Sequence, residues 1–229
     1  MLIGLDIRGA SDAVTYSVKE IYYSLQGEGA NTGRPAVFCR FAGCNLWSGH
    51  ERDRETAICP FCDTDFVGTE GPGGGKYGTA RDLARAVAVA WPGEIQFHQL
   101  RERPLVVCTG GEPLLQLDRD AVTALHEVGF EVAVETNGTI EPPPGLDWIC
   151  VSPKAAAPLE LRRGHELKLV YPQKEAAPEH FVDLEFEFFF LQPMDGPERE
   201  ENTRLAVQYC LEHPQWRLSL QTHKYIGID

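Results

Sequence analysis

The sequence has no long hydrophobic run and no excess of positive charge, and both absences narrow the possible functions. Its 229 residues include no apolar stretch of the roughly 20 residues that a transmembrane helix needs. The first residues, MLIGLDIRGASDAV, lack the basic and apolar segments of a secretory signal peptide. The formal net charge is −13, and contacts to a phosphate backbone require a basic surface. We therefore expect a small-molecule substrate, with no direct binding to nucleic acid or to a membrane.

The sequence also lacks the features of a disulfide-stabilised protein. It has seven cysteines, an odd number, in a chain far longer than small disulfide scaffolds. Unpaired thiols and the absence of an export signal indicate a reducing environment. We therefore expect a cytoplasmic protein with free cysteines.

Three of the cysteines form the most informative motif in the chain. Cys44, Cys59 and Cys62 follow the spacing C-x14-C-x2-C, which ends in the stretch CPFCDTDF. A closed zinc site or an electron-transfer [4Fe-4S] cluster usually takes four protein ligands, so three leave one coordination position open. Because open positions bind substrates or cofactors, the motif favours an enzyme built around an iron-sulfur cluster.

A structural zinc site is the alternative for the same segment. His50 lies between the first two cysteines, and three thiolates with one imidazole are also a zinc ligand set. Such a site would make the chain a zinc-bound binding module without catalysis. The remaining cysteines lie in apolar runs and are expected to pack as small core residues: Cys39, Cys108, Cys150 and Cys210.

Eight apolar segments are predicted to be strands, and several are apolar almost throughout, as is typical of parallel strands covered on both faces. They are VKEIYYS from Val18, AVFCRF from Ala36, LVVCTG from Leu105, EVAVET from Glu131, WICVS from Trp148, ELKLVY from Glu166, FEFFFLQ from Phe186 and WRLSLQ from Trp216.

Helices are fewer than strands. Capping residues and apolar periodicity predict helices from Thr79 to before Pro92, from Asp118 to Gly129 and from about Glu200 to His213. No helix is predicted between Pro142 and Pro178. This pattern favours an α/β fold, an abbreviated, partial TIM-type barrel in a single domain. We expect a short extension at 1–15, the core domain at 16–229 and a loop carrying the cysteines at about 43–78.

Short polar clusters follow five of the apolar strands. TGGEP follows LVVC, ETNG follows EVAV, SPK follows WICV, QPMD follows FFFL, and QTHK follows RLSL. Such residues also break strands, which could explain one or two of these endings. In parallel barrels the carboxyl ends of the strands carry the chemistry, so the set predicts an active site at that face.

A glycine-rich segment is not expected to bind a nucleotide. The residues GGGKYG at 73–78 fit G-x-G-x-x-G, but TEGP before them does not read as a strand, and the dinucleotide motif requires one. The segment from Glu70 to Gly78 is predicted to be a flexible loop.

CPFCDTDF followed by TGGEP resembles the radical S-adenosylmethionine (SAM) superfamily, whose usual spacing is C-x3-C-x2-C. The first gap here is longer and inserts a loop between two ligands. LQGEG at 25–29, RFAGCNLW at 40–47, ETNG and QTHK narrow the resemblance to the 7-carboxy-7-deazaguanine synthase family, and to its members with a long first gap. The resemblance extends from about Tyr16 to the end of the chain.

The resemblance implies a [4Fe-4S] cluster, SAM and Mg²⁺ as cofactors. It implies a lyase of queuosine biosynthesis, a tRNA modification pathway, that converts 6-carboxy-5,6,7,8-tetrahydropterin to 7-carboxy-7-deazaguanine with loss of ammonia. Hydrogen abstraction at C6 by a radical derived from SAM would start the ring contraction. A homodimer and an electron donor such as flavodoxin or ferredoxin are implied as well.

The resemblance also implies residue roles. The cluster would be held by Cys44, Cys59 and Cys62, and Mg²⁺ by Thr64. SAM would be bound by Phe61, Cys62, Asp63, Gly111, Ser152, Pro153, Lys154, Gln192, Pro193, Met194 and Asp195. The substrate would be bound by Leu25, Gln26, Gly27, Arg40, Thr109 and the terminal carboxylate of Asp229.

Some of these roles have a chemical rationale of their own. The planar fork of Arg40 suits the substrate carboxylate, although a surface ion pair is the alternative. The Thr64 hydroxyl suits Mg²⁺ or the local loop. Gly110 and Gly111 would let the backbone approach SAM, and Glu112 would accept a hydrogen bond from its ammonium. Glu28, Glu135 and His223 are further polar candidates at this face, and His223 fits an acid–base or a structural role equally.

A radical activase that abstracts hydrogen from a partner protein is a competing interpretation of the cluster and the GGEP segment. An activase needs a large docking surface. Arg40 and LQGEG instead favour a small carboxylated substrate.

Overall fold

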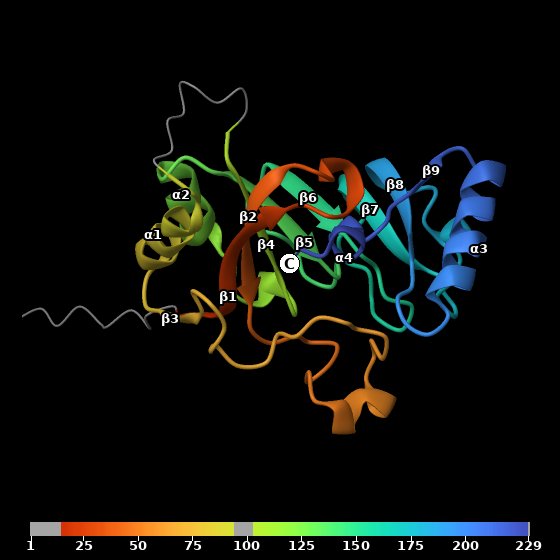
Figure 1. Cartoon of the computed structure of the whole chain (residues 1–229), viewed down its shortest axis with the longest axis horizontal. Coiled ribbons are helices and arrows are strands. Elements are labelled where there is room, and N and C mark those ends of the chain that lie inside the picture. The colour runs from red at the N-terminus through yellow and green to blue at the C-terminus, as the bar shows by residue number, and fades with distance from the viewer. Residues whose placement is uncertain (1–14, 94–102, 229) are drawn as a thin grey trace, which may run out of the picture.

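The computed structural model describes residues 15–93 and 103–228, and its framework is one nine-stranded sheet (Figure 1). The strand order is β3-β1-β2-β4-β5-β6-β7-β8-β9. The strands are β1 (Tyr16–Leu25), β2 (Pro35–Phe41), β3 (Gly75–Tyr77), β4 (Leu105–Gly110), β5 (Glu131–Thr136), β6 (Trp148–Val151), β7 (Arg163–Tyr171), β8 (Glu185–Pro193) and β9 (Trp216–Leu218).

Strands β2 and β4 to β9 run parallel to one another, whereas β1 runs antiparallel to both β2 and β3. The apolar run of β4, from Leu105 to Cys108, is fully buried because side chains cover both of its faces. All eight predicted strands are confirmed. Strands β3 and β9 are the two ends of the strand order and are not paired with each other among the described residues, so the barrel is incomplete.

Helices cover the outer face of the sheet in two groups (Figure 1). Helices α1 (Ala80–Ala90) and α2 (Arg119–Glu127) pack on each other, α1 against β1 and α2 against β5, and α3 (Arg199–Glu212) packs on β8 and β9. The predicted starts of α1 and α2 are confirmed, since Thr79 accepts a hydrogen bond from the Asp82 N–H and Asp118 from the Ala121 N–H.

Short helices complete the chain. They are the 3-10 turns η1 (Gly29–Asn31), η2 (Glu51–Thr56), η4 (Pro113–Leu115) and η5 (Pro178–His180), and the five-residue α4 (Thr222–Ile226). No α-helix occurs between Pro142 and Pro178, as predicted. Helix α4 is absent from the sequence predictions because one turn of helix carries too little periodicity to detect. No helix in the described part of the chain is long and apolar enough to cross a membrane.

The prediction of a loop over Glu70–Gly78 is partly wrong. Gly75–Tyr77 forms β3, which pairs with Tyr16–Val18 of β1. A Cβ on Gly74 would lie 2.2 Å from the Lys19 carbonyl oxygen, and one on Gly71 2.6 Å from the same atom. The glycines therefore allow the segment to lie flat against β1, a close approach between backbones that composition does not reveal.

Two strand boundaries also differ from prediction. Strand β7 begins at Arg163, three residues early, because Arg163 and Gly164 also pair with β8, although they do not extend the apolar run. Strand β9 ends at Leu218, three residues early. Of the predicted extension at 1–15, only Thr15 lies within the described residues.

Candidate active site

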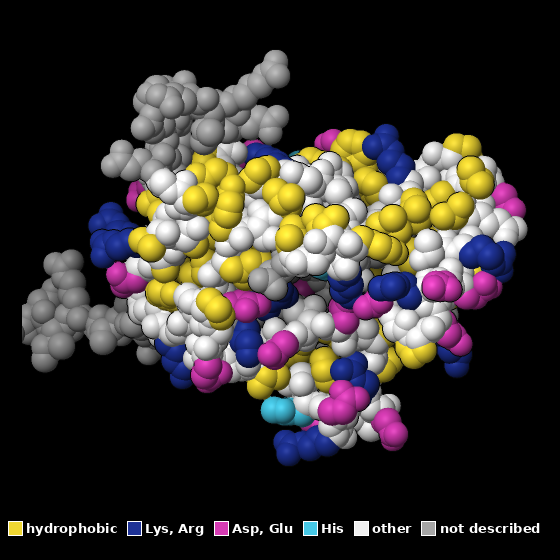
Figure 2. Space-filling view, in the orientation of Figure 1, with side chains coloured by type: hydrophobic (Ala, Val, Ile, Leu, Met, Phe, Trp, Pro, Cys, Tyr) yellow, Lys and Arg dark blue, Asp and Glu magenta, His cyan; other side chains and the backbone are white. Residues whose placement is uncertain are grey.

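A cavity of about 790 Å³ opens at the carboxyl ends of the parallel strands. This volume lies within the range of roughly 300–1,000 Å³ that is typical of small-molecule sites. Figure 2 shows acidic and basic side chains gathered around the hollow at the centre of this face. The polar clusters predicted to meet here do so, since residues from all five of them line the cavity or lie directly behind it.

Strand register places the polar side chains of the cavity side by side. Glu20 of β1 pairs with Arg40 of β2, which in turn pairs with Thr109 of β4. Farther along the sheet, Glu135 of β5 pairs with Cys150 of β6. Because alternate residues of a strand point to the same face, a short apolar run can supply one polar group to the cavity and still keep its other face in the core.

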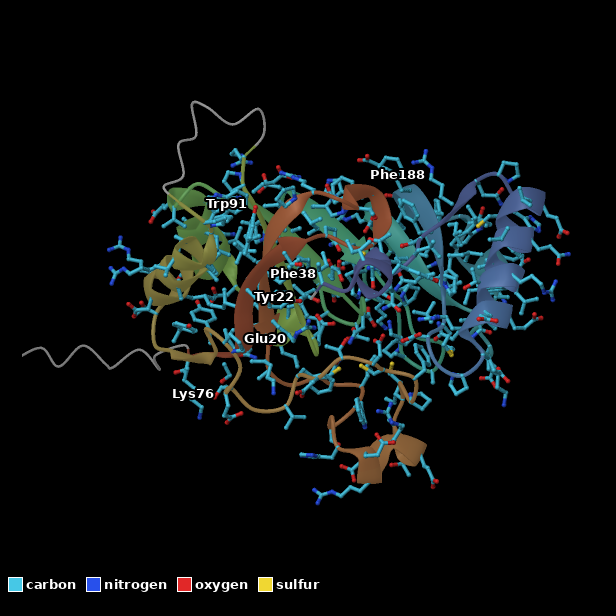
Figure 3. All side chains as sticks on the ribbon, viewed as in Figure 1. Glu20, Tyr22, Phe38, Lys76, Trp91 and Phe188 are labelled. Carbon is cyan, nitrogen blue, oxygen red and sulfur yellow. The ribbon has the colours of Figure 1, made fainter. Side chains whose placement is uncertain are left out.

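Arg40 is already partly paired within the protein. Its Nε donates to Glu20 Oε1 at 2.7 Å and its Nη2 to the Tyr22 hydroxyl at 2.9 Å, along the wall marked in Figure 3 by Glu20, Tyr22 and Phe38. Its Nη1 makes no hydrogen bond to any residue that the structure describes. The guanidinium is thus held in the cavity wall and retains donor capacity for an anionic ligand.

Lys168 is the main site residue that the sequence predictions missed. It lies in the middle of β7, is 4% exposed, and lines the cavity. Its Nζ donates to Glu28 Oε2 at 2.5 Å and lies 3.5 Å from Glu135 Oε2, while Glu135 Oε1 accepts a hydrogen bond from Gln26. A lysine inside an otherwise apolar strand was the signal in ELKLVY that could have identified it.

Lys168, Glu28 and Glu135 form a charged cluster in which each group stabilises the ionised form of its partner. Burial alone would lower the pKa of Lys168, but Glu135 and Glu28 raise it well above its ordinary value. Burial likewise opposes ionisation of Glu28, yet the Lys168 ammonium outweighs it and lowers the pKa of that carboxyl. Both groups are therefore charged at neutral pH.

The three motif cysteines meet at one end of the cavity although 14 residues separate the first two. The backbone N–H groups of Ile58 and Cys59 donate to the Leu46 carbonyl, which closes the intervening loop. A hydrogen bond from Cys59 lowers the pKa of Cys62, and the same bond raises the pKa of Cys59. Burial raises the pKa of Cys44.

The side chains around these thiols fit an iron-sulfur cluster better than a closed zinc site. His50, the candidate fourth ligand, is exposed and does not line the cavity. Within residues 15–93 and 103–228, no three His, Cys, Asp or Glu side chains are placed to hold a single metal ion. The indole Nε1 of Trp47 is buried and has no hydrogen-bond partner among the described residues. Three soft thiolates without a fourth protein ligand beside them suit a cluster.

Arg54 of η2 ties the inserted loop to the second and third cysteines. Its Nη1 donates to the carbonyl oxygens of Pro60 and Cys62, and its guanidinium lies 4.2 Å from the ring centre of Trp47. These contacts join the middle of the insertion to both of its ends. The insertion is therefore part of the wall of the site.

Most of the residues predicted to bind SAM line this same cavity. They are Phe61, Cys62, Asp63, Gly111, Ser152, Lys154, Gln192, Pro193, Met194 and Asp195. Pro153 is buried behind the wall. The Nζ of Lys154 donates to the Ser152 carbonyl and hydroxyl oxygens at 2.6 and 2.8 Å, and burial lowers its pKa.

Gly110 and Gly111 line the cavity, whereas Glu112 has another task than the one predicted. A Cβ on Gly110 would lie 2.2 Å from the Phe41 carbonyl oxygen and one on Gly111 2.0 Å from that of Gly43, so these glycines are required by the neighbouring backbone. Glu112 is fully buried, and it accepts hydrogen bonds from the Thr136 hydroxyl and from the N–H groups of Leu114 and Asn137. Its carboxylate supports the turn behind the cavity and does not line it.

Residues predicted to contact the substrate come from several elements. Leu25, Gln26, Gly27, Arg40 and Thr109 line the cavity, as do the candidates Glu28, Glu135 and His223. Asp229 lies outside the described residues, and its neighbour Ile228 lines the cavity. A Cβ on Gly27 would lie 2.2 Å from His223 Nδ1, so glycine at position 27 lets α4 pack over the site.

The Thr64 hydroxyl is available within the cavity. Thr64 lines the wall next to the thiols and makes no side-chain hydrogen bond to the residues that the structure describes.

A clasp joins α4 to three segments of the cavity wall. The Nζ of Lys224 donates to Asp63 Oδ2 at 2.6 Å and to Asp195 Oδ2 at 2.7 Å, and Thr222 is bonded to the Gly27 carbonyl through both its N–H and its hydroxyl. These contacts place His223 over the cavity. They join residues up to 195 positions apart in the chain, so no local pattern predicts them.

The other cysteines are mostly in the core, as predicted. Cys39 and Cys108 are buried beneath α1 and α2, and Cys210 is half-buried on α3. Cys150 is buried as well, but it also lines the cavity beside Glu135.

Comparison with known proteins shows extensive similarity to one family. A 7-carboxy-7-deazaguanine synthase from Caulobacter vibrioides is 64% identical over 215 residues, which cover 94% of this chain and 100% of that protein. The enzyme of the same name from Bordetella pertussis is 65% identical over 215 residues, with the same coverage. The one from Nitratidesulfovibrio vulgaris is 54% identical over 220 residues and is covered completely.

Similarity extends to a solved structure. The crystal structure of QueE from Escherichia coli superposes with a TM-score of 0.65 at 28% identity, covering 91% of this chain and 95% of that one. No model of a protein family matches the chain. The identity and coverage of the relatives, together with the partial barrel and its cysteine-lined cavity, show that the chain belongs to the 7-carboxy-7-deazaguanine synthase family.

Proposed function

We propose that this chain is a radical SAM lyase that converts 6-carboxy-5,6,7,8-tetrahydropterin to 7-carboxy-7-deazaguanine and ammonia. Full-length identity of 54–65% to enzymes named for that product is the observation that carries the proposal. The cavity supports it, because it combines three thiols with a carboxylate-binding guanidinium and a second charged cluster. The reaction belongs to queuosine biosynthesis.

The cofactors follow from the side chains that line the cavity. Cys44, Cys59 and Cys62 would hold a [4Fe-4S] cluster, and the segments at 61–63, 152–154 and 192–195 would hold SAM. When bound, the cluster and SAM supply a one-electron cleavage that generates the hydrogen-abstracting radical. The Thr64 hydroxyl would bind Mg²⁺, which prefers hard oxygen ligands and retains several waters.

The protein's own contribution is binding, orientation and exclusion of solvent. Arg40 would hold the substrate carboxylate through its unpaired Nη1, and Gln26 and Thr109 would bind the polar edges of the heterocycle. Helix α4 would cover the site, placing His223 and the terminal carboxylate of Asp229 near the substrate. Orientation matters because a radical attacks whichever C–H group is nearest.

Further properties belong to the same proposal. We expect one core domain at 16–229 with an extension at 1–15, a homodimer, a cytoplasmic location, and a flavodoxin or ferredoxin as electron donor. The continuous sheet from β3 to β9 supports the single domain.

Anaerobic turnover tests the function directly. Cluster-reconstituted protein, SAM, Mg²⁺, a reductant and the carboxytetrahydropterin should yield 7-carboxy-7-deazaguanine and ammonia. SAM cleavage without deazaguanine would contradict the substrate and revive the activase interpretation. Colourless, iron-free protein with bound zinc after anaerobic purification would contradict the cofactor as well.

A further inference from the structure

The charged cluster of Lys168, Glu28 and Glu135 lines the cavity, but the proposed function gives its three members no individual roles. Lys168 is 4% exposed, and its Nζ lies 2.5 Å from Glu28 Oε2 and 3.5 Å from Glu135 Oε2. Placing a lysine inside an apolar strand is unfavourable unless carboxylates compensate its charge, and replacing such a group by apolar residues is often neutral or stabilising. Stability alone therefore does not account for the cluster.

The geometry points to a binding function for the two carboxylates. Glu28 and Glu135 both line the cavity, with side chains 14% and 23% exposed, whereas Lys168 lies deeper at 5%. Glu28 comes from the turn after β1, Glu135 from β5 and Lys168 from β7. The ammonium thus ties together carboxylates from two distant segments.

A third glutamate, Glu166, is buried two residues before Lys168 and does not line the cavity. It accepts a hydrogen bond from the Ala30 N–H at 2.8 Å, and burial raises its pKa. The acceptors that face the cavity next to Lys168 are therefore the carboxylates of Glu28 and Glu135.

Arg40 and Lys168 line the cavity from different strands. Arg40 is on β2 and Lys168 on β7, and β4, β5 and β6 lie between these strands in the sheet. A ligand that places its carboxylate at Arg40 would therefore direct another part of itself toward Glu28 and Glu135. In a pterin that part is the aminopyrimidinone edge, a row of N–H donors.

We propose that Lys168 is a positioning residue that holds Glu28 and Glu135 as hydrogen-bond acceptors for the N–H edge of the bound heterocycle. Lys168 itself makes no contact with the substrate carboxylate. This inference rests on the proposed function, because it takes its ligand from there.

Two stable ligands separate this role from a direct contact. Pterin and 6-carboxypterin share the N–H edge, and only the second carries a carboxylate. The measurement uses protein loaded with the [4Fe-4S] cluster and SAM. Lys168→Met should weaken the binding of both ligands by the same factor, about 10- to 100-fold, as expected when a charged hydrogen-bond arrangement is lost. Arg40→Gln is the matched control and should weaken 6-carboxypterin much more than pterin. Isothermal titration calorimetry measures all four affinities without turnover.

A charge-neutral double variant separates positioning from folding. Lys168→Met leaves Glu28 buried without its partner and could destabilise the protein, whereas Glu28→Gln with Lys168→Met removes both charges. The double variant should recover the thermal stability of the unsubstituted protein and still bind pterin about tenfold or more weakly. Recovery of pterin affinity together with stability would mean a structural role and would overturn the inference.

The remaining outcomes also test the inference and distinguish its failure from that of the proposed function. Unchanged pterin binding by a folded Lys168→Met protein, or weakened binding of 6-carboxypterin alone, would overturn the inference and leave the proposed function intact. Failure of the unsubstituted protein to bind either pterin would overturn the proposed substrate and this inference with it. SAM affinity should stay within about twofold in every variant, because the predicted SAM segments do not include Lys168, Glu28 or Glu135.

Discussion

Cys59 and Cys108 show how environment separates residues of the same type. Cys59 contacts Cys62 in the cavity, whereas Cys108 is fully buried in β4 between β2 and β5. The cysteine spacing predicted Cys59 to be a cluster ligand, and apolar neighbours predicted Cys108 to be a core residue, so both predictions were possible from the sequence. Cys150 was harder, because its strand borders both the core and the cavity.

These environments predict opposite effects of substitution. Cys59→Ala should lose the iron and all turnover, since two thiolates cannot hold the cluster. Cys108→Ala should keep the full iron content and lose about 1–3 kcal/mol of stability through the cavity it leaves. Iron and sulfide per chain, with a thermal melt, measure both. Loss of iron from Cys108→Ala would refute this division of the cysteines.

Arg40 is the residue for which charge and shape can be separated. Arg40→Lys keeps the charge but removes the planar fork that donates to Glu20, Tyr22 and a ligand at once. We expect affinity for the carboxytetrahydropterin to fall roughly tenfold and SAM affinity to change little. Titration of each ligand separately provides the measurement. Equal losses for both would contradict the role given to Arg40.

The inserted loop is the element on which the cluster ligands depend most. Its 3-10 turn η2 carries Arg54, which bonds to the carbonyl oxygens of Pro60 and Cys62 and packs on Trp47. The long gap between Cys44 and Cys59 was visible in the sequence, but the path of the loop was not. Its closure uses backbone carbonyls, which every residue has.

Removing that tie should loosen the cluster without abolishing its assembly. Arg54→Gln is expected to lose iron to a chelator roughly tenfold faster than the unsubstituted protein, because two hydrogen bonds to the ligand segment are lost. Arg52→Gln is the control, since Arg52 lies in the same turn with its side chain 80% exposed. The rate of absorbance loss under a chelator measures both. Equal rates in the two variants would contradict the bracing role.

At the scale of the whole molecule, the Lys224 clasp connects the end of the chain to the cysteine loop and to the end of β8. Burial would raise the pKa of Asp63, but its bond to Lys224 outweighs this and lowers the value, and the same lysine lowers the pKa of Asp195. A lowered folded-state pKa means that the stabilising contribution is present above the ordinary value of about 4 and is lost as the pH falls through the lowered one. We therefore expect acid to weaken the contacts between Lys224 and the two carboxylates and so to loosen α4.

Hydrogen exchange tests the clasp. Lys224→Gln should increase exchange in residues 222–228 roughly three- to tenfold at pH 7, as expected for the loss of two partly exposed ion pairs. The difference from the unsubstituted protein should shrink as the pH falls below about 4, because the two carboxylates become protonated only when the pH passes through their lowered pKa values. Lys174→Gln, whose side chain is 93% exposed, is the control. An unchanged C-terminal segment in Lys224→Gln at pH 7 would show that the clasp does not hold α4.

The sequence by itself determined the features that depend on neighbours along the chain. Apolar runs specified the eight strands, Thr79 and Asp118 specified the starts of α1 and α2, and the cysteine spacing predicted an open cluster site. These signals are local, because periodicity and capping act within a few residues.

Only the tertiary structure decided which polar side chains meet. Lys168 and Glu28 pair across 140 positions, α4 is held by Asp63 and Asp195, and the glycines near Gly74 lie against β1. Such contacts arise when the sheet brings distant strand ends together, and no residue pattern along the chain encodes their distances. The core follows from local pattern, whereas the contents of the cavity follow from strand register and closure of the sheet.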